Sequence, residues 1–552
     1  MNKNKLRIIP LGGFGEIGKN MLVIQYDDDI IVVDCGLMFP DEEMLGIDLV
    51  IPDISFLVEN QAKVRGIIIT HAHEDHIGAL PYVLPQLNVP VYCTRLAKGL
   101  ISVKLKERKV LNESKLHVLG VHGKVTLGQF RVEFFPVNHS VPDSVGLIIH
   151  TPIGTLVHTG DFKLDYTPVS GVTTDLGKLA QLGSQGVLLL MADSTYAEVP
   201  GYTPSEMVVG EALDNIIGNA QGRVLVTTFA SLISRMQQVI DAAAKYHRRV
   251  FIAGRSMAEN ARIAAELGYL HIPPGVLGNN DELSRAQREK TVILVTGSQG
   301  EPTSGLVRIA SGGHKQIHLH PTDTVVFSAS PIPGNESLVN RTVDALFKQG
   351  VQVFYGERSK AHVHGHASQE ELKLLQGLVK PRFFLPIHGE YRHLTQHAKL
   401  AQSVGVPPER TFVLEDGEIL ELDHEAGKKA GKVTSGNVYV DGLSVGDVGG
   451  MVLRSRRMLS RDGIVVAIVP LNKQTGKLVG RPEIVSRGFI DMEESREMVE
   501  GARDLLARVL DHGRTHSTER GYVENEVKDA LDKYFYDQTK RRPMILPVLV
   551  QV

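Results

Sequence analysis

The residues best suited to chemistry lie between His71 and His76, where three imidazoles and two carboxylates occur within six positions. The run follows an apolar, strand-like segment at residues 64–70 and precedes a helix expected over about residues 75–84. Divalent cations take neutral imidazole and carboxylate oxygen as ligands. His71 and His73 are placed to face one ion, and Asp75 and His76 to face a second. A solvated turn would explain an isolated His pair, but His-x-His-x-Asp-His after a buried strand favours half of a two-metal site.

The composition limits the class of protein. At 552 residues the chain is too long for one hydrophobic core, so roughly two to four domains are expected. The formal net charge of −3 gives no overall basic field, so attraction of nucleic acid would have to be local. Cys35 and Cys93 offer no disulfide framework, which indicates a reducing compartment. No apolar run approaches the ~20 residues of a membrane span, and residues 1–10 lack a signal-peptide core, so we expect a cytoplasmic protein without membrane contact.

A glycine-rich segment at residues 11–20 resembles two nucleotide-binding motifs without satisfying either. Residues 13–18 match the dinucleotide fingerprint G-x-G-x-x-G, and residues 13–19 nearly match a phosphate-binding P-loop. In the second case, Asn20 stands where the magnesium-binding Ser or Thr is required. Both motifs need a helix to follow, whereas residues 21–26 have the pattern of a strand. We therefore predict a glycine turn within a β-hairpin.

Further polar residues follow predicted strands, namely Asp34, His139, Asp161, Asp193 and His388. The strands that precede them are expected at residues 30–34, 130–137, 155–158, 186–192 and 382–386. None of these side chains is unusual alone, but functional groups in α/β proteins gather where strands end, and the 71–76 run also follows a strand. We therefore expect His139 and Asp161 to converge on the metal site, and Asp34 to orient a metal-bound histidine. His388 repeats this placement, which indicates that the chain returns to the first domain there.

Short strands and helices alternate between residues 204 and 357, which predicts an inserted α/β domain with its own parallel sheet. The insertion interrupts a first domain expected at residues 1–203 and 358–422. A linker is expected at 423–440, followed by a third unit at 441–552 without clustered His or Cys. Three strand-to-helix junctions of the insertion are rich in small polar residues and are suited to bind phosphate through free backbone N–H groups. They span residues 229–233, 254–256 and 328–335.

Three histidines alternate at positions 362, 364 and 366, just before a helix expected from residue 369. Ser368 and Glu371 form the capping-box pattern of that helix, which gives Ser368 a structural explanation. The alternating histidines have no such explanation.

Taken in chain order, these residues resemble the motifs of the bacterial ribonuclease J family, in the β-CASP branch of the metallo-β-lactamase nucleases. The resemblance covers essentially the whole chain and rests on Asp34, the 71–76 run, His139, Asp161, Asp193, His366 and His388. His73 in place of Glu argues against the flavodiiron branch, and His364 stands where the family usually carries a small residue, often Ser. The implied fold is α/β: a metallo-β-lactamase αββα sandwich, an inserted β-CASP domain and a small C-terminal α/β domain.

The resemblance also implies hydrolysis supported by two divalent ions, zinc or manganese. The implied ligands are His71, His73 and His139 for one ion and Asp75, His76 and His388 for the other, with Asp161 shared. His366, oriented by Asp193, would give a proton to the 3′ oxygen that leaves. Asp34 and Asp75 complete the implied catalytic set.

The implied substrate is single-stranded RNA with a preferred 5′ monophosphate, degraded from 5′ to 3′ and also cut internally, in RNA maturation and mRNA decay. The expected nucleotide contacts are Ser231, Leu232, Ile233, Ser330, His362, Val363, His364, Gly365, His366 and Ser368. A homodimer or higher homo-oligomer through the C-terminal domain is implied, as are contacts with other RNA-decay proteins.

Other functions fit parts of the sequence. A hydrolase of a small thioester or lactam would keep the metals, but such enzymes seldom need an insertion of roughly 150 residues, which is a domain in itself. A DNA-directed nuclease of the same branch stays open, because no residue announces recognition of the 2′-OH. An RNA-binding scaffold with a dead site is disfavoured by the complete ligand set. Asp48 and Asp441 are candidates for a structural cation, with solvated surface as the simpler explanation.

Overall fold

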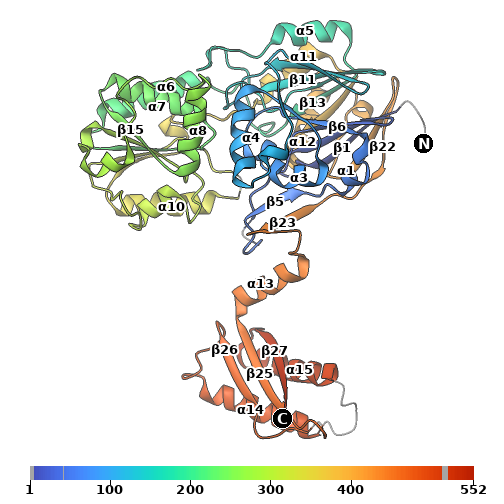
Figure 1. The fold of residues 1–552 in the computed structure, drawn as a ribbon, viewed down its shortest axis with the longest axis vertical. Coiled ribbons are helices and arrows are strands. Elements are labelled where there is room, and N and C mark those ends of the chain that lie inside the picture. Colours follow the sequence, from blue (N-terminus) through green and yellow to red (C-terminus); the bar gives the residue numbers. More distant parts are fainter. Residues whose placement is uncertain (1–4, 42, 333, 476, 513–519) are drawn as a thin grey trace. The chain divides into compact units, whose positions relative to one another are not determined.

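The structure is a computed structural model that describes residues 5–41, 43–332, 334–475, 477–512 and 520–552. Pro333, within the third expected phosphate-binding junction, lies outside these residues. The chain forms two compact units, which Figure 1 shows with their helices and strands. The larger contains the chain up to Phe39 together with Val50–Val438, and the smaller contains Pro40–Leu49 and Tyr439–Val552.

The first sheet of the larger unit has the strand order β22-β21-β1-β3-β4-β6-β7-β8. Its strands are β1 (Leu6–Gly12), β3 (Met21–Tyr26), β4 (Asp29–Val33), β6 (Val64–Ile68), β7 (Val91–Cys93), β8 (Leu116–Val118), β21 (Glu418–Leu422) and β22 (Gly427–Lys432). β1 pairs antiparallel with β3, so the glycine-rich segment between them is a hairpin turn, and that prediction is confirmed. β4 and β6 are parallel, which puts their C-terminal ends at the same edge of the sheet.

The second sheet has the order β19-β13-β12-β11-β10-β9. Its strands are β9 (Lys124–Leu127), β10 (Phe130–Pro136), β11 (Val145–Thr151), β12 (Gly154–His158), β13 (Leu189–Asp193) and β19 (Phe383–Ile387). β12, β13 and β19 are parallel. β10 runs in the same direction, because β11 pairs antiparallel with both β10 and β12. The C-terminal ends of these four strands therefore lie at one edge.

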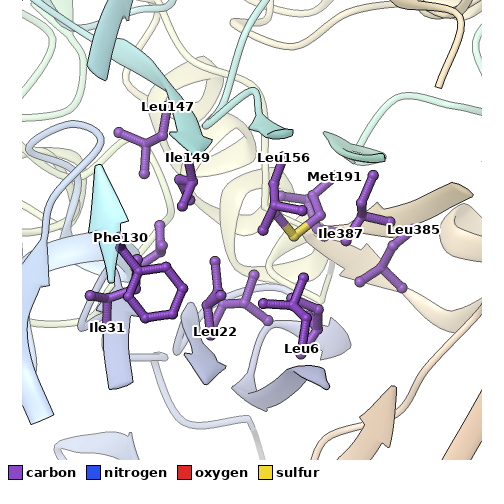
Figure 2. Close-up of a cluster of buried hydrophobic side chains, with 14 of the residues drawn as sticks. Leu6, Leu22, Ile31, Phe130, Leu147, Ile149, Leu156, Met191, Leu385 and Ile387 are labelled. Atoms are coloured by element: carbon purple, nitrogen blue, oxygen red, sulfur yellow. The ribbon is translucent and has the colours of Figure 1, made fainter. Parts of the chain in front are cut away.

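The two sheets enclose a common apolar core, in which Leu22 and Ile31 of the first sheet join Phe130 of the second (Figure 2). Neighbouring residues of the second sheet alternate between this core and an outer one: Leu189 faces inward and Leu190 outward. Because both faces of the sheet are covered, its inner strands are continuous apolar runs rather than alternating ones. The sandwich thus holds rigidly the strand ends that carry the polar residues.

Helices flank the sandwich (Figure 1). They are α1 (Ser55–Glu59), α2 (Glu74–Ile77), α3 (Leu80–Leu87), α4 (Arg95–Glu107), α5 (Leu176–Gln185), α11 (Gln369–Val379) and α12 (Tyr391–Ser403). α5, α11 and α12 cover the outer face of the second sheet through Leu179, Leu375 and Leu400. The single helix expected at residues 75–84 is wrong, because Pro81 lacks the N–H that a continuous helix would bond to the carbonyl of residue 77.

The inserted domain has a parallel sheet of order β15-β16-β14-β17-β18, as its alternating pattern predicts. Its elements are α6 (Glu206–Asn219), β14 (Val224–Thr227), α7 (Ile233–Lys245), β15 (Arg249–Ala253), α8 (Arg255–Glu266), β16 (Thr291–Val295), α9 (Gly305–Ala310), β17 (Thr324–Phe327), α10 (Glu336–Lys348) and β18 (Gln352–Phe354). α9 and α10 pack on one face of the sheet, and Figure 1 shows α6 and α7 on the other. The sequence does not predict α6 or α9, since α6 contains glycines and α9 is short.

The smaller unit has a sheet of order β26-β25-β27 that shares a core with α14 and α15. The elements are α13 (Gly450–Asp462), β25 (Ile464–Leu471), β26 (Glu483–Arg487), α14 (Arg496–His512), α15 (Arg520–Thr539), β27 (Met544–Gln551) and the short strand β24 (Ser444–Val445). The short strands β5 (Leu49–Pro52) and β23 (Asn437–Asp441) lie where the chain passes from one unit to the other. Asp48 accepts the backbone N–H of Gly442, and Asp441 pairs with Arg456. Asp441, one of the two acids named as candidates for a structural cation, thus has the guanidinium of Arg456 as its partner. No helix in the described parts of the chain is both long and apolar enough to cross a bilayer.

Residues 427–432 lie within the expected linker, but they form β22, which pairs antiparallel with β21. This hairpin extends the first sheet beyond β1. The prediction of an open linker at 423–440 is therefore wrong for this part. Lys428, Lys429 and Lys432 give β22 the polar composition of a linker, and lysine is equally typical of an exposed edge strand.

Candidate metal centre

The ends of the parallel strands carry the predicted site residues. Asp34 follows β4, the 71–76 run follows β6, and His139, Asp161, Asp193 and His388 lie at the ends of β10, β12, β13 and β19. The structure brings the donor atoms of the histidines and of three acids, Asp75, Asp161 and Asp193, into overlapping groups, which also include His366. Both sheets contribute to the two groups that contain His71 and His76, so these groups form only in the folded sandwich.

The first group consists of His71, His73, His139 and Asp161, whose donor atoms lie within 4.8 Å of one another. Nε2 of His71 and Nε2 of His139 each lie 3.1 Å from Nδ1 of His73. Tetrahedral Zn²⁺, bound at about 2.0–2.1 Å, places its ligand atoms about 3.3 Å apart. The three imidazoles therefore fit a single divalent ion.

The second group consists of Asp75, His76, His388 and Asp161, again within 4.8 Å. Nε2 of His76 and Nε2 of His388 each lie 3.5 Å from Oδ2 of Asp75. Oδ2 of Asp161 lies 3.2 Å from Nε2 of His76, and the same oxygen lies 3.7 Å from Nε2 of His71 in the first group. Asp161 is therefore common to both groups.

Hydrogen bonds on the far side of the rings fix how the histidines face the site. Nδ1 of His76 donates to Asp34 at 2.8 Å, and Nδ1 of His139 donates to the carbonyl of Gly365 at 2.8 Å. In both rings this turns Nε2 toward the donor groups. Asp34 also accepts the N–H and the hydroxyl of Thr70. Asp34 thus orients His76 from the side of the ring that faces away from the donor groups, and it also holds Thr70.

Burial keeps His73 and His139 of the first group neutral, whereas a neighbouring carboxylate favours the charged form of His388 in the second group. Burial lowers the pKa of His139 to about 3 and that of His73 to about 4, so both rings offer neutral lone pairs at pH 7. Burial works against ionisation of Asp161, but the imidazoles of His388 and His76 hold the pKa of its carboxyl well below its usual range. Burial would lower the pKa of His388, yet the Asp161 carboxylate raises it to about 9. Positive charge is therefore favoured beside Asp161, which suits a cation.

His366 lies next to Asp161 and is oriented by Asp193. Its Nδ1 donates to Oδ2 of Asp193 at 2.7 Å and lies 4.0 Å from Oδ2 of Asp161. Burial disfavours the charged ring, but the Asp193 carboxylate outweighs it and raises the pKa of His366 above the ordinary value. His366 is therefore suited to hold a proton at the edge of the metal centre.

Tyr196 is a residue of the site that the sequence prediction misses. Its ring stacks on His364 with centroids 3.6 Å apart and an interplanar angle of 12°. His364 in turn donates from Nδ1 to the carbonyl of His366 at 2.8 Å. The large side chain at position 364 is thus held against Tyr196. Its position in the sequence could have indicated it, because Tyr196 follows the same strand as Asp193.

The residues expected to contact a nucleotide divide by exposure. Ser231, Ser330, His362, His364 and His366 are partly exposed, whereas Leu232, Ile233, Val363, Gly365 and Ser368 are buried. The buried residues can offer only backbone groups to a ligand. The capping box predicted for Ser368 and Glu371 is present, and the Ser368 hydroxyl also lies 3.0 Å from that of Thr203. Ser368 therefore serves the start of α11, and its contact with a nucleotide stays a prediction.

A buried ion network holds the segment that carries the alternating histidines. Arg235, only 1% exposed, donates to Glu206 at 2.7 Å and to the carbonyl of Ala361 at 2.9 Å. Nζ of Lys163 lies 3.3 Å from the other oxygen of Glu206. Burial alone would raise the pKa of Glu206, but Arg235 and Lys163 bring it to about 2. The network joins α7 to the loop of Asp161, and the sequence prediction misses it because it omits α6.

Models of known families match most of the chain. The metallo-beta-lactamase superfamily matches residues 15–196, the ribonuclease J beta-CASP domain 221–346, the Zn-dependent metallo-hydrolase RNA specificity domain 356–413 and the ribonuclease J C-terminal domain 451–552. These matches confirm the predicted fold class. Together with the clustered histidines and carboxylates, they identify a divalent-metal site.

Relatives match from end to end. Ribonuclease J2 of Bacillus subtilis is 42% identical over 552 residues, covering 100% of this chain and 99% of that protein. The chain belongs to the ribonuclease J family. Ribonuclease J of Thermus thermophilus shares 45% over 556 residues, covering 100% of this chain and 96% of its own. A solved structure of a protein of unknown function from Enterococcus faecalis, at 18% identity, covers 76% of this chain and 100% of its own with a TM-score of 0.54, which supports the fold alone.

Proposed function

We propose that this member of the ribonuclease J family is a metal-dependent ribonuclease that hydrolyses single-stranded RNA at the Asp161 centre. The observation that carries the proposal is the sharing of Asp161 by two donor groups, with a proton-holding His366 beside them. The relatives named ribonuclease J and the match of residues 356–413 to an RNA specificity domain support RNA as the substrate.

The ligands in this proposal are His71, His73 and His139 for one ion and Asp75, His76 and His388 for a second, with Asp161 bridging. Zinc or manganese suits this mixture of nitrogen and oxygen donors. When bound, such a pair supplies Lewis acidity to the attacking water and the phosphate oxygens. Asp34 and the carbonyl of Gly365 hold His76 and His139 in the tautomers that this requires.

In this proposal His366 gives its Nε2 proton to the 3′ oxygen as the phosphodiester breaks, while Asp193 holds Nδ1. Asp193→Asn should therefore move the alkaline limb of the kcat profile to lower pH. The Asp193 carboxylate raises the pKa of His366, so a neutral amide lowers it, and the acid form is then lost earlier as pH rises. Rates measured across pH at saturating RNA check this, and an alkaline limb at the wild-type position would remove Asp193 from the mechanism.

The preference for a 5′ end is a finer part of the proposal. Helix α7 begins next to Ser231, where the positive end of the helix dipole favours an anion, and Arg235 of the same helix fixes the segment of His362 to His366. A closed phosphate pocket there would favour 5′-to-3′ degradation, and an open groove would also permit internal cuts. We expect RNA with a 5′ monophosphate to be degraded faster than the same RNA with a triphosphate. Equal rates on two labelled RNAs would count against a closed pocket.

A substrate panel tests the proposed function. Purified protein with added Zn²⁺ or Mn²⁺ should degrade single-stranded RNA, with much slower loss of DNA of the same sequence and no turnover of an acyl thioester. Preference for DNA would favour a DNA-directed nuclease, and thioester turnover without RNA loss would favour a small-molecule hydrolase. We further propose that the protein acts in the cytoplasm, in RNA maturation and mRNA decay. In this proposal it forms a homodimer or higher homo-oligomer through the C-terminal domain and contacts other RNA-decay proteins.

A further inference from the structure

Asn20, the residue that disqualifies the P-loop motif, lies beneath the metal centre. Its side chain belongs to the glycine turn between β1 and β3 and is 8% exposed. Nδ2 lies 3.3 Å from Oδ2 of Asp75, 3.1 Å from the carbonyl of Asp75 and 3.2 Å from Nε2 of His76. A single carboxamide thus touches two members of the second donor group.

The backbone of Asn20 is tied to the same residues. Its N–H donates to the carbonyl of Asp75 at 3.0 Å, and its carbonyl accepts the N–H of Gly36 at 3.0 Å. A Cβ on Gly36 would lie 1.6 Å from the carbonyl oxygen of Asp75, and a Cβ on Gly13 would lie 2.2 Å from Oδ1 of Asn20. Gly36 is therefore required for the segment after β4 to approach the metal-binding loop, and Gly13 is required for the turn to close around the Asn20 side chain.

The other side of the turn is anchored by Lys19, which is 1% exposed. Its Nζ lies 2.8 Å from Glu16 and donates to Asn437 at 2.7 Å. Close by, β2 (Phe14–Gly15) pairs in parallel with β20 (Gly389–Glu390), directly after His388. The turn is thus fixed independently of Asn20, so the carboxamide presents its N–H from a rigid base.

A cavity of about 20 Å³ adjoins the carboxamide, and Asn20, His76, Asp161 and His388 are among the residues that line it. A space of this size holds about one water molecule. Truncation of Asn20 would therefore enlarge an existing cavity beneath the second donor group and free Asp75 to turn.

We propose that Asn20 is a positioning residue for the second ion: its carboxamide donates to Asp75 and holds that carboxylate, with the His76 ring, toward the cation. The inference rests on the proposed function, since it assumes an ion held by Asp75, His76 and His388. Within the described residues, the Asn20 side chain makes no hydrogen bond to His71, His73 or His139. Its removal should therefore weaken one ion and spare the other.

The test is a Zn²⁺ titration of chelator-treated protein, with competition against a chelator to give the affinity of each ion. Wild type should bind two ions. Asn20→Ala and Asn20→Leu should keep one at the wild-type affinity and bind the other about 10- to 100-fold more weakly, as is typical when a partner of a metal ligand is lost. Leu matches Asn in size, so it separates the lost N–H from the lost volume. Asn60→Ala is the matched control, because that carboxamide donates to the carbonyl of Phe56, which belongs to neither donor group.

Unchanged affinity for both ions in both Asn20 variants would overturn the inference. Equal weakening of both ions, together with a lowered Tm of the metal-free protein, would overturn it in favour of a general structural role. A wild-type protein that binds fewer than two ions would instead contradict the proposed ligand sets, and the inference would fall with them.

Discussion

Asp161→Asn should reduce RNA hydrolysis by at least the ~10²–10³-fold typical of removing one charge-stabilising group from an active site. The substitution keeps the size of the side chain but removes the negative charge that the two donor groups share. Oδ2 of Asp161 lies 3.2 Å from His76 and 3.7 Å from His71, so neither ion keeps its common carboxylate. We expect bound metal to fall below the wild-type content at the same free Zn²⁺ concentration, measured by mass spectrometry alongside the rate.

Asp175→Asn is the matched control for this experiment. Asp175 is the N-cap of α5, where its side chain accepts the N–H of Lys178, and Asn caps helices about as well as Asp. This variant should keep the wild-type rate and metal content. An Asp161→Asn protein that retained both would show that Asp161 does not bridge two ions.

His366→Ala should lower kcat by about 10²–10⁴-fold, the range lost with a general acid, while the content of bound metal stays at the wild-type value. His366 belongs to neither proposed ligand set, and Asp193 holds its ring beside them. Removal of the acid matters only when the leaving oxygen needs a proton. In an RNA with sulfur in place of the 3′ bridging oxygen, the leaving group is a stable thiolate that needs no proton. Cleavage of this RNA should therefore be far less sensitive to the substitution.

His150→Ala serves as the control for His366→Ala, because His150 lies on β11 and pairs with Glu133 outside the site. It should leave both the rate and the metal content unchanged. Full turnover of ordinary RNA by His366→Ala would exclude its role as the acid. Loss of bound metal from that variant would place His366 among the ligands instead.

The residues of the metal centre could be predicted because each follows an apolar run that the fold buries on both faces. His139, Asp161 and His388 stand out in the sequence for that reason, and Figure 2 shows the strands that carry them meeting in one core. Asn20 could not be predicted in the same way. Its partner Asp75 lies 55 positions away, and the local glycine pattern is that of a nucleotide-binding turn.

The errors in the fold have separate physical causes. The break between α2 and α3 could have been predicted from Pro81, because a helix cannot accommodate its missing N–H in the interior without kinking or breaking. The strand β22 could not be predicted from the sequence, because an exposed edge strand and a linker share the same lysine-rich composition. The Arg235–Glu206 pair depends on α6 packing against α7, which only the tertiary structure shows.

The most direct test of a metal-dependent ribonuclease is a single titration that follows bound metal and RNA cleavage together. Protein stripped by a chelator should leave single-stranded RNA intact, and cleavage should appear in proportion to the Zn²⁺ or Mn²⁺ bound as the ion is restored. Full RNA cleavage by protein shown to hold no metal would contradict the account.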